Sequence, residues 1–397
     1  AASRPGSSAI VAGALTERSP AAIALAAASS SASGTITAAD RDTGDATILP
    51  TAMASIYGTF IADASGNWTY ALKNTSTAVQ SLNAGQTVFD TFSVTTAGGA
   101  SQTVTIAVTG VNDRPTLSSS AKLLTLAEDA SPTTGPTVAT LFGGRFGDVD
   151  SGASLGGVLV TANAATAGQG TWLYKAVGGA WTAIPTSGLS TTHALALDAD
   201  TQIKFVPALN YNGTPGALTV YAADDQYAGG FSTSAGAVLA DTGAEGVSVA
   251  GVSLSITISA VNDAPTFSPA TDVAVGFAES ALTDSVADLT TAAGAALSGS
   301  VAATDVENDA LTFAIQGGSV VGGLSVLQGT YGKLSLNPLT GAWTYLPNKT
   351  VAINALDVGE TGVDSFTLRV ADPSGASATK VLAVSITGAN DTPVLKA

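Results

Sequence analysis

The sequence contains no cysteine and only one histidine in 397 residues. Without cysteine there is no disulfide, no thiolate nucleophile and no thiolate zinc site, and an oxidising compartment can be neither inferred nor excluded. A single histidine excludes a metallohydrolase centre with several histidine ligands. This residue, His193, has no acidic neighbour in "STTHALAL", and we interpret it as a surface or strand-end side chain. We therefore predict that the protein is not an enzyme. The sequence does contain enough acidic pairs for a glycosidase mechanism that uses only carboxylates, which stays as an alternative.

Basic residues and long apolar runs are also scarce. Fourteen Lys and Arg stand against 30 Asp and Glu, for a net charge of −16. This balance argues against nucleic acid or anionic lipid as a partner and favours a cation as the charged ligand. No apolar run reaches the roughly 18 residues of a membrane span, and the N-terminal stretch lacks the pattern of a signal peptide. We expect a mature protein or, more specifically, an internal piece of a longer chain.

The residues that are abundant favour strands and turns. The chain has 44 glycines and is rich in Thr, Val, Ser and Ala, which suit short strands joined by tight turns. Helical periodicity is convincing nowhere, because the one candidate, residues 20–34, carries too many serines. At about 100 to 200 residues per domain, the length predicts two to four domains.

A short motif recurs three times along the chain. It is "VNDRP" at residues 111–115, "VNDAP" at 261–265 and "ANDTP" at 389–393. Eight, six and four residues before each Asn stands an apolar residue, in alternation with mostly polar neighbours; the three sets are Val104, Ile106 and Val108; Leu254, Ile256 and Ile258; and Leu382, Val384 and Ile386. Alternation at a fixed offset predicts that the same final strand leads to the same junction each time. With strand signals every 8 to 12 residues, we predict an all-β tandem array of antiparallel β-sandwich domains over residues 1–113, 114–263 and 264–397.

The first and third repeats share an aromatic segment, and the middle repeat diverges. The segment is "GNWTYALKN" at 66–74 and "GAWTYLPNK" at 341–349. We interpret its aromatic residues, Trp68, Tyr70, Trp343 and Tyr345, as packed on one sheet, with a sugar-stacking platform as the alternative. The middle repeat carries a Gly- and Ser-rich insertion at 229–248, which could form a ligand-facing loop.

Acidic residues recur in one order after each linker. A Glu comes first, then a pair of acids spaced as Asp-x-Asp or Asp-x-Glu, and then an Asp near the end of a predicted strand. Calcium binds six to eight oxygens, and alternate residues can direct two carboxylates at one ion. An isolated Asp-x-Asp more often caps its own turn. The repeated order, however, favours calcium, because clustered carboxylates without a cation would repel one another.

Several of these segments together resemble a known family. The segments "SGTITAADRDTGD", "GNWTYALKN", "SLNAGQTVFDTFSV" and "IAVTGVNDRP" resemble the bacterial VCBS repeat, a cadherin-like domain of large secreted adhesins, including those with RTX export signals. The middle repeat, with "GTWLYKAVGGAW" and "ISAVNDAP", resembles the cadherin-like domains of the same proteins. The resemblance implies cadherin-like, Ig-like sandwiches held rigid by calcium at each junction.

The resemblance also implies which residues bind Ca²⁺. The first junction would use Asn112, Asp113, Glu128, Asp148, Asp150 and Asp224; the second would use Asn262, Asp263, Glu279, Asp305, Glu307 and Asp372; partial sites would use Glu17, Asp40 and Asp42 at the start and Asn390 and Asp391 at the end. Gly98 stands where the other repeats have the strand-end Asp, and Arg18 stands where the middle repeat has Asp129. Both departures weaken the N-terminal site.

We therefore predict a non-enzymatic, calcium-stiffened extender segment of a bacterial surface or secreted adhesin or matrix protein. Its partners would be calcium and neighbouring repeats of the same longer chain, with surface glycans or self-association into fibres also open. The alternatives are a carbohydrate- or protein-binding module that uses the middle insertion, a structural filament or sheath subunit, and a calcium-triggered self-cleaving module at Asp372-Pro373.

Overall fold

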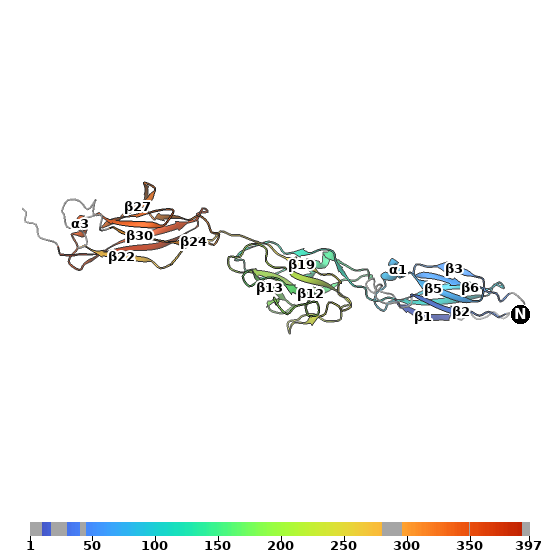
Figure 1. Cartoon of the computed structure of the whole chain (residues 1–397). Helices are drawn as coiled ribbons and strands as arrows, with labels where there is room; N and C mark the ends of the chain where they lie inside the picture. Colours follow the sequence, from blue (N-terminus) through green and yellow to red (C-terminus); the bar gives the residue numbers. More distant parts are fainter. Residues whose placement is uncertain (1–9, 17–29, 40–44, 280–295, 349, 391–397) are drawn as a thin grey trace, which may run out of the picture. The chain divides into compact units, whose positions relative to one another are not determined.

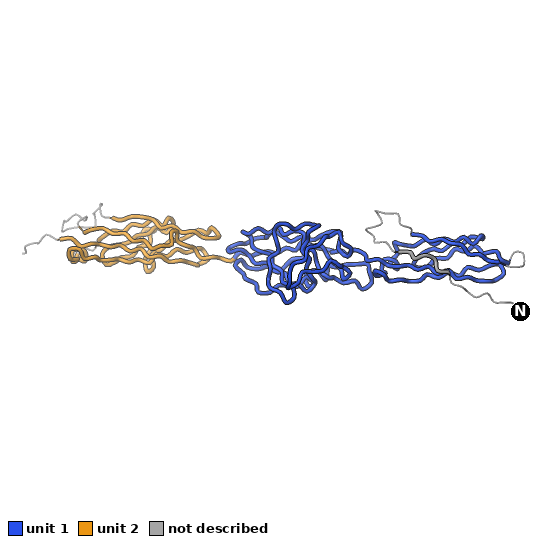
Figure 2. The backbone as a smooth tube through the Cα atoms, turned by 90° about the horizontal axis from the view of Figure 1, so that it is seen from below, with its two compact units in different colours: residues 1–260 blue, residues 261–397 orange. Residues whose placement is uncertain are grey.

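The computed structural model describes residues 10–16, 30–39, 45–279, 296–348 and 350–390. It divides into two compact units, residues 1–260 and 261–397, which Figure 2 colours separately. Within the first unit, the described buried apolar residues gather in one cluster from residues 36–108 and in others from residues 121–258. The all-β prediction is confirmed. The exact three-domain boundaries stay a prediction.

The first sandwich packs a three-stranded sheet of order β1-β7-β6 against a four-stranded sheet of order β2-β5-β4-β3. Its first and last strands, β1 and β7, pair in parallel. The elements are β1 (Ile10–Thr16), β2 (Ser31–Thr35), β3 (Thr51–Ala54), β4 (Gly58–Ala62), β5 (Asn67–Leu72), α1 (Thr77–Gln80), β6 (Thr87–Thr95) and β7 (Ser101–Thr109).

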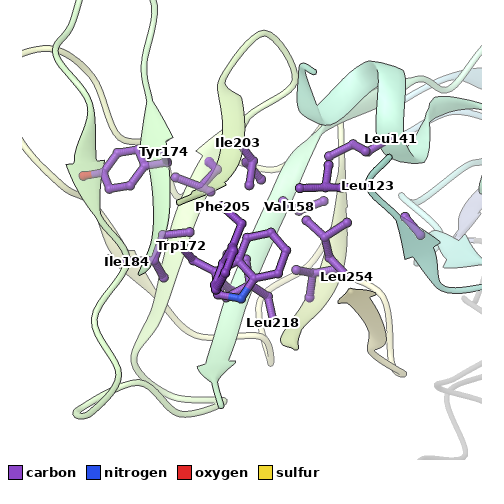
Figure 3. Packing of buried hydrophobic residues seen from close by; sticks show 14 of the residues in the cluster. Leu123, Leu141, Val158, Trp172, Tyr174, Ile184, Ile203, Phe205, Leu218 and Leu254 are labelled. Carbon is purple, nitrogen blue, oxygen red and sulfur yellow. The ribbon is translucent and has the colours of Figure 1, made fainter. Parts of the chain in front are cut away.

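The middle sandwich has a six-stranded sheet of order β18-β15-β12-β17-β19-β9 and a three-stranded sheet of order β14-β13-β16. Trp172 and Phe205 meet edge to face in the core between the sheets (Figure 3). The elements are β8 (Thr116–Leu117), β9 (Ala121–Lys122), β10 (Leu126–Ala127), α2 (Val138–Phe142), η2 (Gly143–Arg145), β11 (Phe146–Gly147), β12 (Leu155–Asn163), β13 (Gly170–Lys175), β14 (Thr182–Ala183), β15 (Ala194–Asp198), β16 (Gln202–Pro207), β17 (Leu218–Asp224), β18 (Leu239–Ala240), β19 (Val252–Ser255) and β20 (Ile258–Ser259).

The third sandwich packs a four-stranded sheet of order β22-β31-β30-β25 against a five-stranded sheet of order β23-β29-β28-β27-β26 (Figure 1). Here too the first long strand, β22, pairs in parallel with the last strand, β31. The elements are β21 (Thr266–Phe267), β22 (Val273–Ala278), β23 (Leu297–Ser300), β24 (Ala303–Thr304), β25 (Thr312–Ile315), β26 (Ser319–Val321), β27 (Leu324–Gln328), β28 (Gly332–Leu336), β29 (Ala342–Pro347), α3 (Thr350–Ile353), β30 (Thr361–Ala371) and β31 (Ser377–Thr387).

The alternating residues of the three final strands enter the cores, as their pattern predicts. Val104, Ile106 and Val108 are fully buried, and so are the corresponding residues of the other two repeats. In the middle repeat the last strand is interrupted between β19 and β20, yet Ile256 between them is fully buried. The alternating pattern therefore reports burial on one face even where the strand pairing lapses.

The insertion at 229–248 packs against the outer face of the six-stranded sheet. Tyr227, Val247 and partly buried residues such as Phe231 form a small second core with Leu159. The linker residue Arg114 fastens this segment, donating from Nε to the carbonyl of Val247 at 2.6 Å and from Nη2 to the carbonyl of residue 242 at 2.6 Å. Part of the insertion is therefore a packed layer of the middle sandwich, while residues 233–237 are exposed. A ligand-facing role of these residues stays a prediction.

Candidate cation sites at the strand ends

The first linker is held by a chain of three hydrogen bonds to acidic side chains. Asn112 Nδ2 donates to Asp224 Oδ2 at 2.9 Å. The amide of Asp113 donates to Asp150 Oδ2 at 2.8 Å, and the amide of Asp150 donates to Asp148 Oδ1 at 2.9 Å. The structure thus brings together five of the six residues expected at this junction.

The second linker repeats the same chain of bonds within unit 2. Asn262 Nδ2 donates to Asp372 Oδ2 at 2.8 Å. The amide of Asp263 donates to Glu307 Oε2 at 3.2 Å, and the amide of Glu307 donates to Asp305 Oδ1 at 3.0 Å. Glu307 replaces the second Asp of the pair without changing the pattern. We name these two sets of residues the first and second linker circuits.

Both circuits leave equivalent carboxylate oxygens buried without a hydrogen bond. In the first circuit these are Asp148 Oδ2 and Asp150 Oδ1; in the second they are Asp305 Oδ2 and Glu307 Oε1. A buried anionic oxygen without a donor costs free energy unless a cation compensates it. Asp148 and Asp305 each cap their own turn with one oxygen. The same two positions nevertheless keep a second buried oxygen without a donor at both described linkers, which turn capping alone does not explain.

The electrostatics of the first circuit favour a bound cation. Burial raises the pKa of Asp224 to about 6, and the charges of Asp148 and Asp225 act in the same direction, although the hydrogen bond from Asn112 opposes them. Burial also raises the pKa values of Asp148 and Asp150. A divalent ion would relieve both the desolvation and the repulsion, and protons would compete with it.

The second circuit differs at its strand-end acid. The hydrogen bond from Asn262 holds the pKa of Asp372 below its usual value. Asp372 Oδ1 also accepts from Ser374 Oγ at 2.8 Å and from the amide of Gly375 at 2.7 Å. The next residue is Pro373, where the first circuit has a second carboxylate, Asp225. Asp372 therefore caps its own turn as well as accepting from the linker Asn.

The donor set suits calcium, but it does not form a complete shell. Carboxylate and amide oxygens are the ligands that calcium prefers. A cleft of about 40 Å³, lined by Asn83, Asn112, Asp150, Asp225 and neighbouring residues, adjoins the first circuit. No three acidic side chains among the described residues already form a group that could hold a metal. Binding would therefore have to draw the carboxylates inward and recruit backbone oxygens.

Glu128 lies at the other end of the middle sandwich. Its amide donates to the carbonyl of Ser259, and its Oε2 accepts from Asn212 Nδ2 at 3.2 Å. Asp224 lies beyond Val220, which pairs with Val252 at the start of β19. Asp224 is four residues beyond this pair and Ser259 is seven residues beyond it in the opposite direction, so at about 3.3 Å per residue the two acids are roughly 35 Å apart. Assigning Glu128 to the first junction was therefore wrong.

Glu279 is displaced from its expected partners in the same way. Ala278 pairs with Thr387 at the end of β31, and Glu279 Oε2 accepts from the amide of Ala389 at 2.8 Å. Asp372 lies next to Ala371, which pairs with Ser377 at the start of β31. The structure thus places Glu279 at the third linker, beside Asn390, and not with Asn262.

Some predicted residues stand outside these observations. Glu17, Asp40, Asp42 and Asp391 lie outside the described residues. Gly98, where the other repeats have an acid, donates its amide to the carbonyl of Asp45 at 3.0 Å.

Sequence reasoning missed two further contributors. One is Asp225, which lines the cleft of the first circuit and follows Asp224 directly in "YAADDQ". The other is the loop before β6. A Cβ on Gly110 would lie 2.3 Å from the carbonyl oxygen of Leu82, and one on Gly388 would lie 2.4 Å from that of Asp357. The available signal was the local pattern that both repeats share, a Leu followed three residues later by a Gly (Leu82 and Gly85, Leu356 and Gly359).

The aromatic residues shared by the first and third repeats are core residues. Trp68, Tyr70, Trp343 and Tyr345 are at most 4% exposed, which confirms sheet packing and contradicts the sugar-stacking platform. His193 is exposed in a tight turn, as expected.

Comparisons with known proteins find a family match for one part of the chain and several similar solved structures. Residues 262–388 match the family described as bacterial cadherin-like domain. Solved structures similar to the chain include a protocadherin gammaB7 EC3-6 cis-dimer (16% identity, 94% of this chain and 75% of that chain, TM-score 0.44). Another is mouse cadherin-23 EC22-24 (15% identity, 96% of this chain and 95% of that chain, TM-score 0.44). No curated protein matches the chain. The segment that contains the second linker circuit is thus similar to bacterial cadherin-like domains.

Proposed function

We propose that the chain is a calcium-stiffened extender segment of a bacterial surface or secreted adhesin, without enzymatic activity. The observation that carries the proposal is the repetition of the linker circuit, with the same buried carboxylate oxygens left without donors. A turn motif accounts for each Asp-x-acid pair separately. It does not account for the same linker amides bonding to the same acids in both repeats.

In the proposed mechanism the protein supplies the geometry and calcium supplies the charge. The linker Asn orients the strand-end acid, while the linker Asp binds the acid pair through its amide. Asp148 with Asp150, and Asp305 with Glu307, would hold the ion. Calcium bound to the folded form alone would stabilise it by mass action and order the linker. Extracellular modules bind calcium with a Kd of about 10⁻⁴ to 10⁻³ M, which suits a secreted or surface-exposed segment.

The remaining parts of the proposal follow from this role. The acids gather in repeated circuits, and a repeated ion site explains repetition better than one active site does. The family match of the third repeat supports a bacterial adhesion module with further repeats of the same chain as neighbours. No helix among the described residues is long and apolar enough to cross a membrane. Surface glycans and self-association into fibres are additional partners for direct binding assays.

Calcium titration with matched variants tests the proposal. We expect calorimetry of the full chain to detect calcium binding at both circuits. Asp150→Asn and Glu307→Gln keep an acceptor oxygen and the side-chain size but remove a charge. Each should weaken its own site by at least about tenfold and leave the other unchanged, because ligand charge sets calcium affinity.

Asp241→Asn is the matched control. Asp241 is exposed and caps its own turn, accepting from the amide of Gly243 at 2.7 Å. Its neutralisation removes the same charge without touching a circuit, so calcium binding should not change. If Asp241→Asn and Asp150→Asn lower the calcium affinity equally, the effect comes from net charge alone and the proposed sites are refuted.

A further inference from the structure

The middle sandwich contains a cavity of about 620 Å³, away from both linker circuits. The segment after β9 follows β19 and β20 as far as Glu128, and then reaches β16 at Pro136, whose carbonyl accepts from Ile203. The cavity lies beneath this crossing, where the edges of the two sheets separate. Its size falls in the range of pockets for small organic ligands.

The floor of the cavity is made of apolar core side chains, and its rim includes exposed residues such as Leu124. Leu123, Leu141, Phe205 and Ile256 line it, and each is at most 9% exposed. Figure 3 shows Leu123, Leu141 and Phe205 reaching the same interior from three different segments. A ligand that enters would therefore exchange water for core surface, which favours an aliphatic or aromatic body.

The charged side chains of the lining are all cationic. Lys122, Arg145 and Lys204 all line the cavity, and no acidic residue does. The guanidinium of Arg145 is fixed by bonds from Nη1 to the carbonyl of Leu141 at 2.6 Å and from Nε to that of Ser120 at 3.2 Å. Lys204 Nζ is fixed by the carbonyl of Pro132 at 2.7 Å. In a chain of net charge −16, three cations and no carboxylate in one lining give this cavity a positive local field.

We propose that this cavity binds a small amphiphilic anion, with a carboxylate on an aliphatic body. The apolar walls take the body, and the field of Lys122, Arg145 and Lys204 selects the anionic head. Electrostatic complementarity argues against a neutral or cationic ligand. This site is independent of calcium and of the proposed extender role.

A homologous series of carboxylates tests the ligand class. We expect calorimetry of the full chain, in chelator, to show binding of hexanoate, octanoate and decanoate. Affinity should rise about fourfold per added methylene until the cavity is full. Acetate should not bind measurably, and decanol should bind at least about tenfold more weakly than decanoate. Chelator keeps this result separate from that of the calcium sites.

Charge reversal at the cavity mouth tests the location. Lys122 is exposed on β9, and Lys175 lies on β13 of the same sandwich outside the cavity lining. Lys122→Glu should weaken decanoate binding about tenfold, while Lys175→Glu, with the same change of charge, should not. Absence of decanoate binding, equal binding of decanol, or equal weakening by both variants would overturn the proposal.

Discussion

Two glycines set how closely a strand approaches a tryptophan ring. Gly34 pairs with Trp68 across β2 and β5, and Gly299 pairs with Trp343 across β23 and β29. A Cβ on Gly299 would lie 2.6 Å from a carbon of the Trp343 ring, and one on Gly34 would lie 2.5 Å from the matching carbon of Trp68. Both indoles are buried. The absence of a side chain on one strand therefore makes room for the ring on the next.

Gly299→Ala should destabilise the third sandwich. The added methyl group overlaps a ring that is enclosed by the core, and overpacking of this kind costs about 1 to 3 kcal/mol. Ser300→Ala, on the same strand and exposed, serves as the control. Urea unfolding followed by tryptophan fluorescence measures both. Equal stability of the two variants would show that the ring can move aside.

At the scale of elements, the linker Arg114 links two parts of the middle repeat. It binds carbonyls of residues 242 and 247 in the insertion. The amide of Asp224 donates to the carbonyl of Gly246, so the insertion also contacts the strand-end acid of the first circuit. The second linker has Ala264 at the equivalent position. The hydrogen bonds of Arg114 thus substitute for some of the apolar packing that would otherwise be needed to hold the insertion against the sheet.

Arg114→Ala should loosen the insertion locally. Loss of the charged hydrogen bonds should lower the local opening free energy of residues 239–248 by about 1 to 3 kcal/mol. Hydrogen exchange at the amide of Ser248, which bonds to the carbonyl of Ala222, measures this opening. Arg114→Lys keeps the charge but has one nitrogen where the guanidinium has several, so it should lower the opening free energy by an intermediate amount. Unchanged exchange in Arg114→Ala would contradict the proposed fastening.

Local patterns predicted the strands but not the ends at which some acids lie. The alternation before each linker identified β7 and β31, because one buried face leaves a period of two in the sequence. The position of Glu279 depends instead on the parallel pairing of β22 with β31. That pairing joins residues more than a hundred positions apart, so no local spacing reports it. The roles of Asp90 and Asp364 were also hidden: each accepts a hydrogen bond from a buried tyrosine hydroxyl.

At the scale of the whole molecule, calcium should govern thermal stability. At calcium about a hundredfold above Kd, one site stabilises the folded form by about 2.7 kcal/mol. Removal by EDTA should then lower the Tm by about 5 to 10 °C. Solution scattering of the same samples should show a broader distribution of sizes without calcium. A melt and a scattering profile that are both insensitive to EDTA would rule out stiffening by calcium.

The parallel pairing of first and last strands also has a mechanical meaning. All six residues of β22 pair with β31, so a force pulling the two ends of the third sandwich apart acts along the strands. Such a force shears the inter-strand hydrogen bonds together, whereas a force across the strands would open them one at a time. Forced unfolding is limited by the unfolding rate. The third sandwich should therefore unfold more slowly under tension along its strands than under tension across them.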